Sequence, residues 1–181
     1  SLFRPLGSDS DTLDGLNVHF AVIDELHAHK TRAVYDVIDT ARGAREQSLL
    51  WNITTAGTDR SGICYERRTH STKVLERVIE DPAIFGIIYT IDDADDPFKP
   101  ESWAKANPNW GKSVLEDDMV AAARKAEAMP SALANFLTKR LNVWVNGESA
   151  WMDMRAWERC AKPGLSLADV PRDTPGWMGL D

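Results

Sequence analysis

Two short stretches of sequence decide the fold: VHFAVIDE at residues 18–25 and LLWNITTAG at residues 49–57. Each begins with a run of apolar residues rich in β-branched and aromatic side chains, which is typical of a buried strand. Each then turns polar, the second one with a glycine, as is usual where a strand gives way to a loop. We therefore expect one strand over residues 18–23, followed by an acidic loop, and a second strand over residues 49–55.

The segment between these two strands has the spacing of a helix. Over residues 31–46, apolar side chains recur three and four positions apart, at Ala33, Val34, Val37, Ile38 and Ala41, so that they share one helical face. Strand, helix and strand together span about the 30 residues of a βαβ unit, whose two strands lie parallel in one sheet. The sequence thus predicts an α/β layer architecture.

The pattern changes after residue 96. Before it, a second helix over residues 61–80 and a third strand over residues 84–91 repeat the alternation of the first half. After it come three predicted helices without strands, over residues 102–106, 114–129 and 132–141. From residue 146 onward, glycine and proline are frequent, which is typical of turns and linkers. We expect a sheet-forming first half and a helical second half.

Composition excludes several classes of protein. With 43% hydrophobic and 27% charged residues, the chain falls in the range of an ordinary globular domain. Its longest apolar runs are far shorter than the roughly 20 residues of a membrane span, so we expect no membrane contact. Cys64 and Cys160 lack the spacing of a zinc site or a disulfide framework, so we expect both to be reduced. The formal charge of −7 repels a phosphate backbone, so any nucleic-acid contact has to be local.

Polar side chains follow both predicted strands. Asp24 and Glu25 end the first, and Thr54 and Thr55 end the second. Two adjacent acids at a strand end suit a nucleotide hydrolase, in which one carboxylate lies near magnesium and the next orients the attacking water. Two solvated acids in a loop are the simpler interpretation of that pair alone. Because neighbouring parallel strands end on one edge about 5 Å apart, all four side chains should converge there, which favours a nucleotide site.

Two other interpretations remain open on the residues alone. Asp24, Glu25, His27 and His29 form a cluster that a metal-dependent hydrolase would use, although the spacing of the two histidines does not match the usual helical ligand pair. Seven tryptophans would also suit a non-catalytic, Trp-rich interaction module. Of these, Trp51, Trp144 and Trp177 fall on apolar segments, where we expect them to be buried. The basic pairs 67–68 and 139–140 have a chance to touch DNA or a phosphate, but solvated helix faces are the simpler interpretation.

Several motifs in sequence order resemble the large terminase subunits of tailed phages. VIDELH at residues 22–27 resembles the segment around that family's Walker B motif, and ITTAG at residues 53–57 resembles its coupling motif. The remaining matches are FRPL at 3–6, TLDGLN at 12–17, WAKANPN at 103–109, NF at 135–136, LNVW at 141–144 and Trp151. The resemblance covers nearly the whole chain and rests on the order of the motifs rather than on any one of them.

This resemblance implies an ATPase that drives double-stranded DNA into a procapsid, joined to a nuclease that cuts the concatemer. It makes Glu25 the catalytic base and Asp24 the carboxylate associated with Mg²⁺. Thr54, Thr55 and Gly57 would be the coupling motif and contribute, with Asp24, to binding ATP. Asp181 would be the first residue for the divalent metal of the nuclease domain.

The fold implied is α/β: a partial parallel sheet of the P-loop NTPase type with flanking helices, followed by a helical segment and a linker. Residues 1–145 would form the C-terminal part of the ATPase domain, and residues 146–181 a linker and the first strand of an RNase H-like nuclease. The implied partners are double-stranded DNA, a portal protein, a small terminase subunit and further copies in a homo-oligomeric ring. The implied location is the host cytoplasm.

One element of the family pattern is missing from these residues. No Gly-x-x-x-x-Gly-Lys-Ser/Thr sequence occurs in the 181 residues, so they lack the loop that cradles the phosphates. We expect a piece of a longer protein that cannot hydrolyse ATP by itself. Since a phosphate-loop strand would normally pair beside residues 49–55, we also expect an unpaired apolar edge there and self-association or marginal stability.

Overall fold

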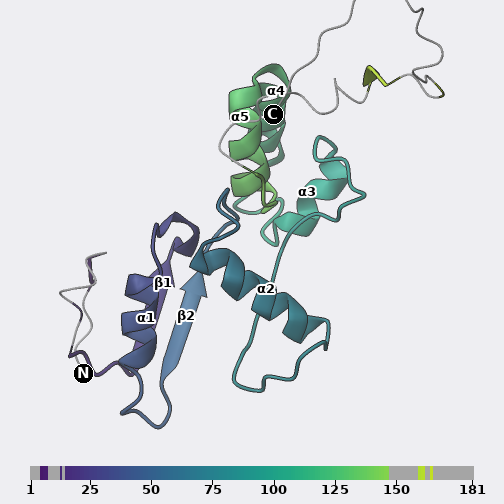
Figure 1. Ribbon diagram of the computed structural model, residues 1–181. Helices are drawn as coiled ribbons and strands as arrows, with labels where there is room; N and C mark the ends of the chain where they lie inside the picture. Colours follow the sequence, from purple (N-terminus) through teal and green to yellow (C-terminus); the bar gives the residue numbers. More distant parts are fainter. Residues whose placement is uncertain (1–4, 8–12, 14, 147–158, 162–163, 165–181) are drawn as a thin grey trace, which may run out of the picture. The chain divides into compact units, whose positions relative to one another are not determined.

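Two parallel strands form within residues 18–25 and 49–57. In the computed structural model, β1 (Phe20–Asp24) pairs with β2 (Leu49–Ile53) from Phe20 opposite Leu49 to Asp24 opposite Ile53 (Figure 1). The pairing is parallel, and the chain between the strands contains helix α1 (Ala33–Thr40). The predicted strand, helix and parallel strand are therefore confirmed.

The structure describes residues 5–7, 13, 15–146, 159–161 and 164. The chain divides into two units, Ser1–Ala150 and Trp151–Asp181. All of the secondary structure discussed below belongs to the first unit. Trp177 and Asp181 lie outside the described residues.

One face of the two-stranded sheet is covered by helices. Ala21, Ile23 and Leu50 point to this face and pack with the apolar stripe of α1, where Tyr35 and Ile38 are buried. Helix α2 (Ile63–Leu75) adds the buried side chains of its first turn. The buried members of this first core are Leu13, Ile23, Leu26, Tyr35, Ile38, Ala56, Ile63, Cys64 and Trp144. Trp144 is buried as the sequence predicted.

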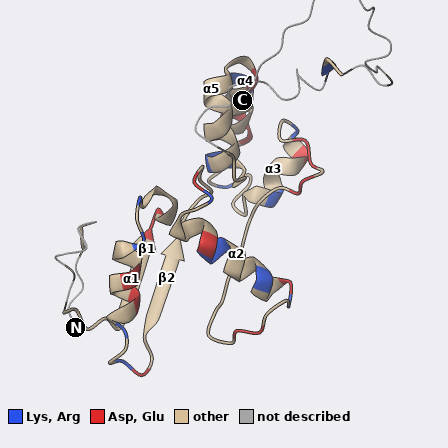
Figure 2. Cartoon of the chain, in the orientation of Figure 1, with Lys and Arg blue, Asp and Glu red and all other residues tan. Residues whose placement is uncertain are grey.

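The opposite face of the sheet is apolar and exposed. Because partners in register on neighbouring strands point to the same side, alternate residues of β1 and β2 form one continuous surface. β2 carries no charged residue along its length (Figure 2). The exposed members are Phe20, Val22, Leu49, Trp51 and Ile53, between 45% and 57% accessible. The prediction that Trp51 is buried was wrong, since its side chain lies on this uncovered face.

The predicted third strand over residues 84–91 is not formed. Within the described part of the chain, the only sheet has two strands, β1 and β2. The segment nevertheless keeps the alternation of a strand, with Phe85, Ile87 and Tyr89 exposed and the residues between them partly buried. Apolar periodicity marks a sequence that suits a strand, but a ladder also needs a neighbouring backbone to hydrogen-bond with.

The second half of the first unit is helical, as predicted. It contains α3 (Pro100–Ala106), α4 (Glu116–Ala128), α5 (Pro130–Asn135) and the π-helical turn η3 (Phe136–Arg140). Pro100 and Pro130 stand at the first helical positions, where the missing N–H has no intrahelical partner to lose. A second core joins these elements through Trp103, Met119, Ala123, Ala126, Phe136 and Leu141. Among the described residues, no helix has the length and apolar character needed to cross a bilayer.

The uncovered sheet face makes self-association of this chain a direct expectation. Replacing Trp51, whose side chain is 57% exposed, with glutamate puts a charge in the middle of that face. We predict that Trp51→Glu lowers the mass measured by light scattering toward the 20.2 kDa of one chain. The free energy of unfolding should change little, by about 0.5 kcal/mol or less, because the side chain is largely solvated already.

Leu115→Glu is the matched control for this change. Leu115 is 58% exposed and precedes α4, outside the sheet. The control should leave the measured mass unchanged. A wild-type chain that is monomeric at every concentration would contradict the expectation.

Candidate functional site

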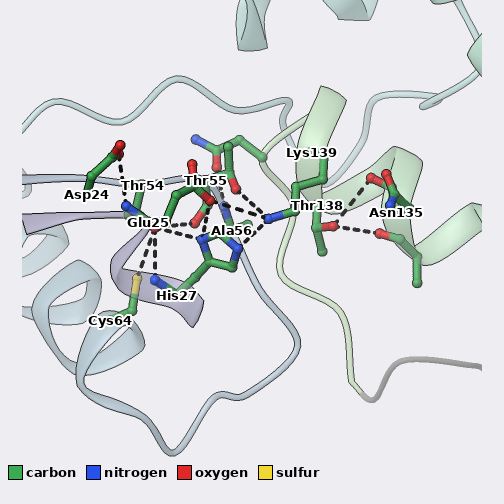
Figure 3. A network of polar contacts seen from close by, with 12 residues as sticks. Asp24, Glu25, His27, Thr54, Thr55, Ala56, Cys64, Asn135, Thr138 and Lys139 are labelled. Carbon is green, nitrogen blue, oxygen red and sulfur yellow. Dashed lines mark hydrogen bonds and ion pairs between the residues drawn. The ribbon is translucent and has the colours of Figure 1, made fainter. Parts of the chain in front are cut away.

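The polar residues that follow β1 and β2 meet at one edge of the sheet. Asp24 is the last residue of β1 and pairs in register with Ile53, the last residue of β2. Glu25 follows the first strand and Thr54 and Thr55 follow the second. Figure 3 shows Glu25, Thr54 and Thr55 in one polar network at this edge, with Asp24 beside it and bonded to the N–H of Glu25. The structure therefore brings together four of the predicted site residues, as parallel pairing requires.

Glu25 adopts an unusual backbone conformation. Its φ of 52° and ψ of 42° lie in the left-handed region, and it precedes the short 3₁₀-helix η2 (Leu26–Ala28). Its N–H donates to Oδ1 of Asp24 at 2.9 Å, while Leu26, 1% exposed, anchors the next residue in the first core. A non-glycine residue in this region costs about 1–3 kcal/mol and is frequent at functional sites. The strained turn separates the directions of the two adjacent carboxylates.

His27 connects the acidic loop to the threonines. Its backbone N–H and its ring Nδ1 both lie 3.0 Å from Oγ1 of Thr54, and Nδ1 lies 3.3 Å from Oε2 of Glu25. The Thr54 hydroxyl donates its own hydrogen to the carbonyl of Thr55 at 2.9 Å. With its only hydrogen directed at Thr55, this hydroxyl acts as an acceptor toward the His27 ring, and Sγ of Cys64 approaches the same oxygen at 3.7 Å. We therefore assign the Nδ1–H tautomer to His27, which leaves Nε2 as an acceptor.

The acceptor Nε2 of His27 faces a lysine from the helical half of the chain. Nζ of Lys139 contacts this nitrogen closely, and it lies 3.2 Å from Oγ1 of Thr55 and 3.8 Å from Oε2 of Glu25. Burial, and then the charge of Lys139, lowers the pKa of His27. Since the ordinary value is already below 7, the imidazole is neutral at pH 7, as an acceptor facing an ammonium must be.

Lys139 is the residue of this network that sequence reasoning did not assign to the site. The pair 139–140 was noted only as a basic pair with a chance to meet DNA or a phosphate. Lys139 and His27 are 112 positions apart in sequence. No local sequence pattern predicts a contact between residues that far apart in the chain.

Gly57 is required by a close approach. A Cβ at this position would lie 3.2 Å from Cβ of His27 and 3.4 Å from Cζ3 of Trp144. The first distance is tighter than ordinary van der Waals contact, so a side chain here would push on His27. The glycine predicted as part of the coupling motif thus lets the indole of Trp144 and the acidic loop lie directly against this turn.

The segment after the π-helical turn is bonded to the same turn. Asn142 accepts from the N–H of Ala56 at 2.6 Å and donates to the carbonyl of Tyr89 at 2.7 Å. Its φ is 57°, a conformation that asparagine tolerates better than most residues. Arg60 donates to the carbonyl of Trp144 at 2.8 Å. Residues 139–144 are therefore fixed on the turn that carries Thr55, Ala56 and Gly57.

The metal-cluster interpretation of the histidines gains no support. Across the described ranges, no group of three or more His, Cys, Asp or Glu side chains is arranged to hold a metal ion. His27 is committed to Thr54 and Lys139.

The edge of the sheet offers a different donor set. The exposed carboxylate of Asp24 supplies oxygen donors, which suit Mg²⁺ bound largely through water. Asp181, the predicted metal residue of the nuclease, is not among the described residues.

Two family models match consecutive parts of this chain. A family model described as "Terminase large subunit, ATPase domain" matches residues 1–73, and one described as "Terminase large subunit, endonuclease domain" matches residues 78–175. The acidic loop and the threonines thus fall in the first match, and Lys139 falls in the second. The predicted division at residues 145 and 146 stays a prediction.

Two individual proteins are similar to this chain. Protein YmfN of Escherichia coli (strain K12) is 39% identical over 154 residues, which are 85% of this chain and 34% of that protein. The crystal structure of the HK97 bacteriophage large terminase matches with a TM-score of 0.64 and 31% identity, covering 81% of this chain and 30% of that one. The chain spans about a third of the length of both. With two consecutive family models matching residues 1–73 and 78–175, the chain belongs to the terminase large subunit family.

Proposed function

We propose that these residues supply the hydrolytic edge of an ATP-driven motor that moves double-stranded DNA into a procapsid. The observation that supports this most is the convergence of Asp24 and Glu25 with Thr54 and Thr55 at the carboxyl edge of two parallel strands. Ligands of open α/β sheets bind at this edge. The substrate we propose is therefore ATP, with its terminal phosphate beside the threonines.

In this proposal, Glu25 is the general base. Its carboxylate is 56% exposed, so it can reach a water molecule in front of the sheet edge. The left-handed backbone of Glu25 constrains the direction in which that carboxylate points, and the His27 ring packs beside it with Nδ1 3.3 Å from Oε2. A base held in this way orients the water and accepts its proton as the bond to phosphorus forms.

Asp24 is the residue that would hold Mg²⁺. When bound, Mg²⁺ would offset the negative charge of the phosphates. Asp24 would orient metal-bound water through its carboxylate, and its Oδ1 also fixes the N–H of Glu25 at 2.9 Å. Thr54, Thr55 and Gly57 would sense the state of the nucleotide, since their turn contacts both the acidic loop and residues 139–144.

The wider role follows from the family and is part of the proposal. The full-length protein would also carry a nuclease with its own divalent metal, to which Asp181 would contribute. It would act with a portal protein, a small terminase subunit and further copies of itself in a ring, in the host cytoplasm. The 181 residues alone contain no phosphate-binding loop, so we expect them not to hydrolyse ATP without the rest of the protein.

The role of Glu25 is tested in a full-length protein that carries these residues together with a phosphate-binding loop. Glu25→Gln keeps the shape of the side chain but cannot accept a proton. We predict that kcat for ATP falls about 100-fold or more. Binding of a fluorescent ATP analogue should change less than about threefold, because the substitution leaves the phosphate contacts in place.

Glu76→Gln is the control for Glu25→Gln, because Glu76 is an exposed acid at the end of α2, away from the edge. It should hydrolyse ATP at the wild-type rate. Loss of nucleotide binding in Glu25→Gln with unchanged turnover would reverse the assignment.

The role of Asp24 is tested by titrating Mg²⁺. Asp24→Asn removes the negative charge but keeps an oxygen that can accept from the N–H of Glu25. We predict that the Mg²⁺ concentration for half-maximal ATP hydrolysis rises about tenfold, because the variant loses roughly one charge-assisted interaction with the metal-bound water. An unchanged Mg²⁺ requirement in a folded variant would show that Asp24 does not serve the metal.

A further inference from the structure

A basic side chain from the helical half of the chain enters the proposed hydrolytic network. Nζ of Lys139 contacts Nε2 of His27, the hydroxyl of Thr55 at 3.2 Å and the carboxylate of Glu25 at 3.8 Å (Figure 3). These three groups come from the acidic loop and from the turn after β2. Lys139 is thus the point where both loops of the sheet edge meet the helical half.

The backbone around Lys139 holds its ammonium in place. Lys139 belongs to the π-helical turn η3 (Phe136–Arg140), a wide turn that is rare in proteins and frequent at functional sites. On one side of it, Phe136 is 3% exposed in the second core, and on the other, Leu141 is fully buried there. Asn142, three residues after Lys139, accepts a hydrogen bond from the N–H of Ala56. The lysine is therefore anchored before and after its own position, which limits the entropy lost when its ammonium binds.

The hydrogen-bond pattern gives the ammonium a defined task. The Nδ1–H of His27 is directed at Thr54, so Nε2 needs a donor, and Lys139 supplies it. With both ring nitrogens occupied, the imidazole has one orientation, in which Nδ1 lies 3.3 Å from Glu25. The same ammonium fixes the Thr55 hydroxyl. Without Lys139, the ring of His27 and the carboxylate of Glu25 would each lose a restraint.

The contacts also join the two parts of the chain that match different family models. Lys139 lies in the residues matched by the endonuclease-domain model, whereas Glu25, His27 and Thr55 lie in those matched by the ATPase-domain model. A shift of Thr55 would reach the helical half through this ammonium.

We propose that Lys139 is a positioning residue for ATP hydrolysis, which orients Glu25 through His27 and ties the Thr55 turn to the helical half of the chain. The proposal rests on the proposed function of Glu25 as the base. It assigns Lys139 no contact with the phosphates. Its effect should therefore appear in turnover and not in nucleotide binding.

The test uses the full-length protein and steady-state ATP hydrolysis. We expect Lys139→Ala to lower kcat about 10- to 100-fold, the loss that small misplacements of a catalytic group produce. KM for ATP should change less than about threefold. Lys139→Arg, which keeps a charged donor of similar reach, should recover at least a third of the wild-type kcat. Should the alanine variant fail to fold, Lys139→Met, which keeps the aliphatic stem, takes its place.

Arg140→Ala is the matched control, because the neighbouring Arg140 pairs with Asp118 at 2.8 Å instead of entering the network. It should hydrolyse ATP at the wild-type rate. A wild-type kcat in folded Lys139→Ala would overturn the proposal, and so would a raised KM with unchanged kcat, which would make Lys139 a nucleotide ligand. Glu25→Gln in the same assay distinguishes failure of the role of Lys139 from failure of the role of Glu25 as the base. If it is inactive while Lys139→Ala is fully active, only the role of Lys139 fails; if it is fully active, the proposed base fails as well.

Discussion

The parallel pairing of β1 with β2 is the constraint on which the site depends. With Asp24 opposite Ile53, both strands release their polar residues at one edge, and Glu25, His27 and Thr54 come within hydrogen-bonding range. A shift of one residue in this register would move every side chain of β2 to the other face. Asn52 would move to the exposed face and Ile53 to the covered face. The threonines would move away from the acidic loop. The burial of Ile23 and Leu50 against α1 opposes that shift.

The segment from Leu141 to Trp144 links the two cores residue by residue. Leu141 is buried in the helical core, and Val143 packs against that core, while Trp144 is buried in the core under the sheet. Asn142 between them bonds to the turn after β2 and to Tyr89. Neither core can shift along this segment without disturbing the contacts of the other. The geometry around Gly57 is thus set by packing on both sides of it, and not by the strands alone.

The sequence predicts correctly those parts of the structure that depend on local residue patterns. The two strands, the helix between them and the helices of the second half follow from periodicity, and the convergence of Asp24, Glu25, Thr54 and Thr55 follows from parallel pairing. The third strand was wrong because the segment over residues 84–91 has the alternation of a strand but no backbone partner in the described part of the chain. Trp51 was predicted to be buried because an apolar strand residue usually packs against another layer. Here no layer of the described chain covers its face of the sheet, so its side chain is exposed. The contacts of Lys139 and Asn142 could not be predicted from the sequence, since they join residues more than 50 positions apart.

The two-stranded sheet contributes little to the stability of the site, which is held mainly by contacts from other parts of the chain. A two-stranded sheet is weak by itself, because few backbone bonds offset the entropy of ordering it. Its exposed face, with Trp51 at 57%, contributes little hydrophobic stabilisation. The edge that carries Glu25 and Thr55 therefore depends on what holds it from other directions: the first core beneath Leu26, and the side chains of Lys139 and Asn142 from the helical half. A base in a strained turn has to be held by its surroundings, and here part of them, Lys139 and Asn142, comes from more than a hundred positions further along the chain.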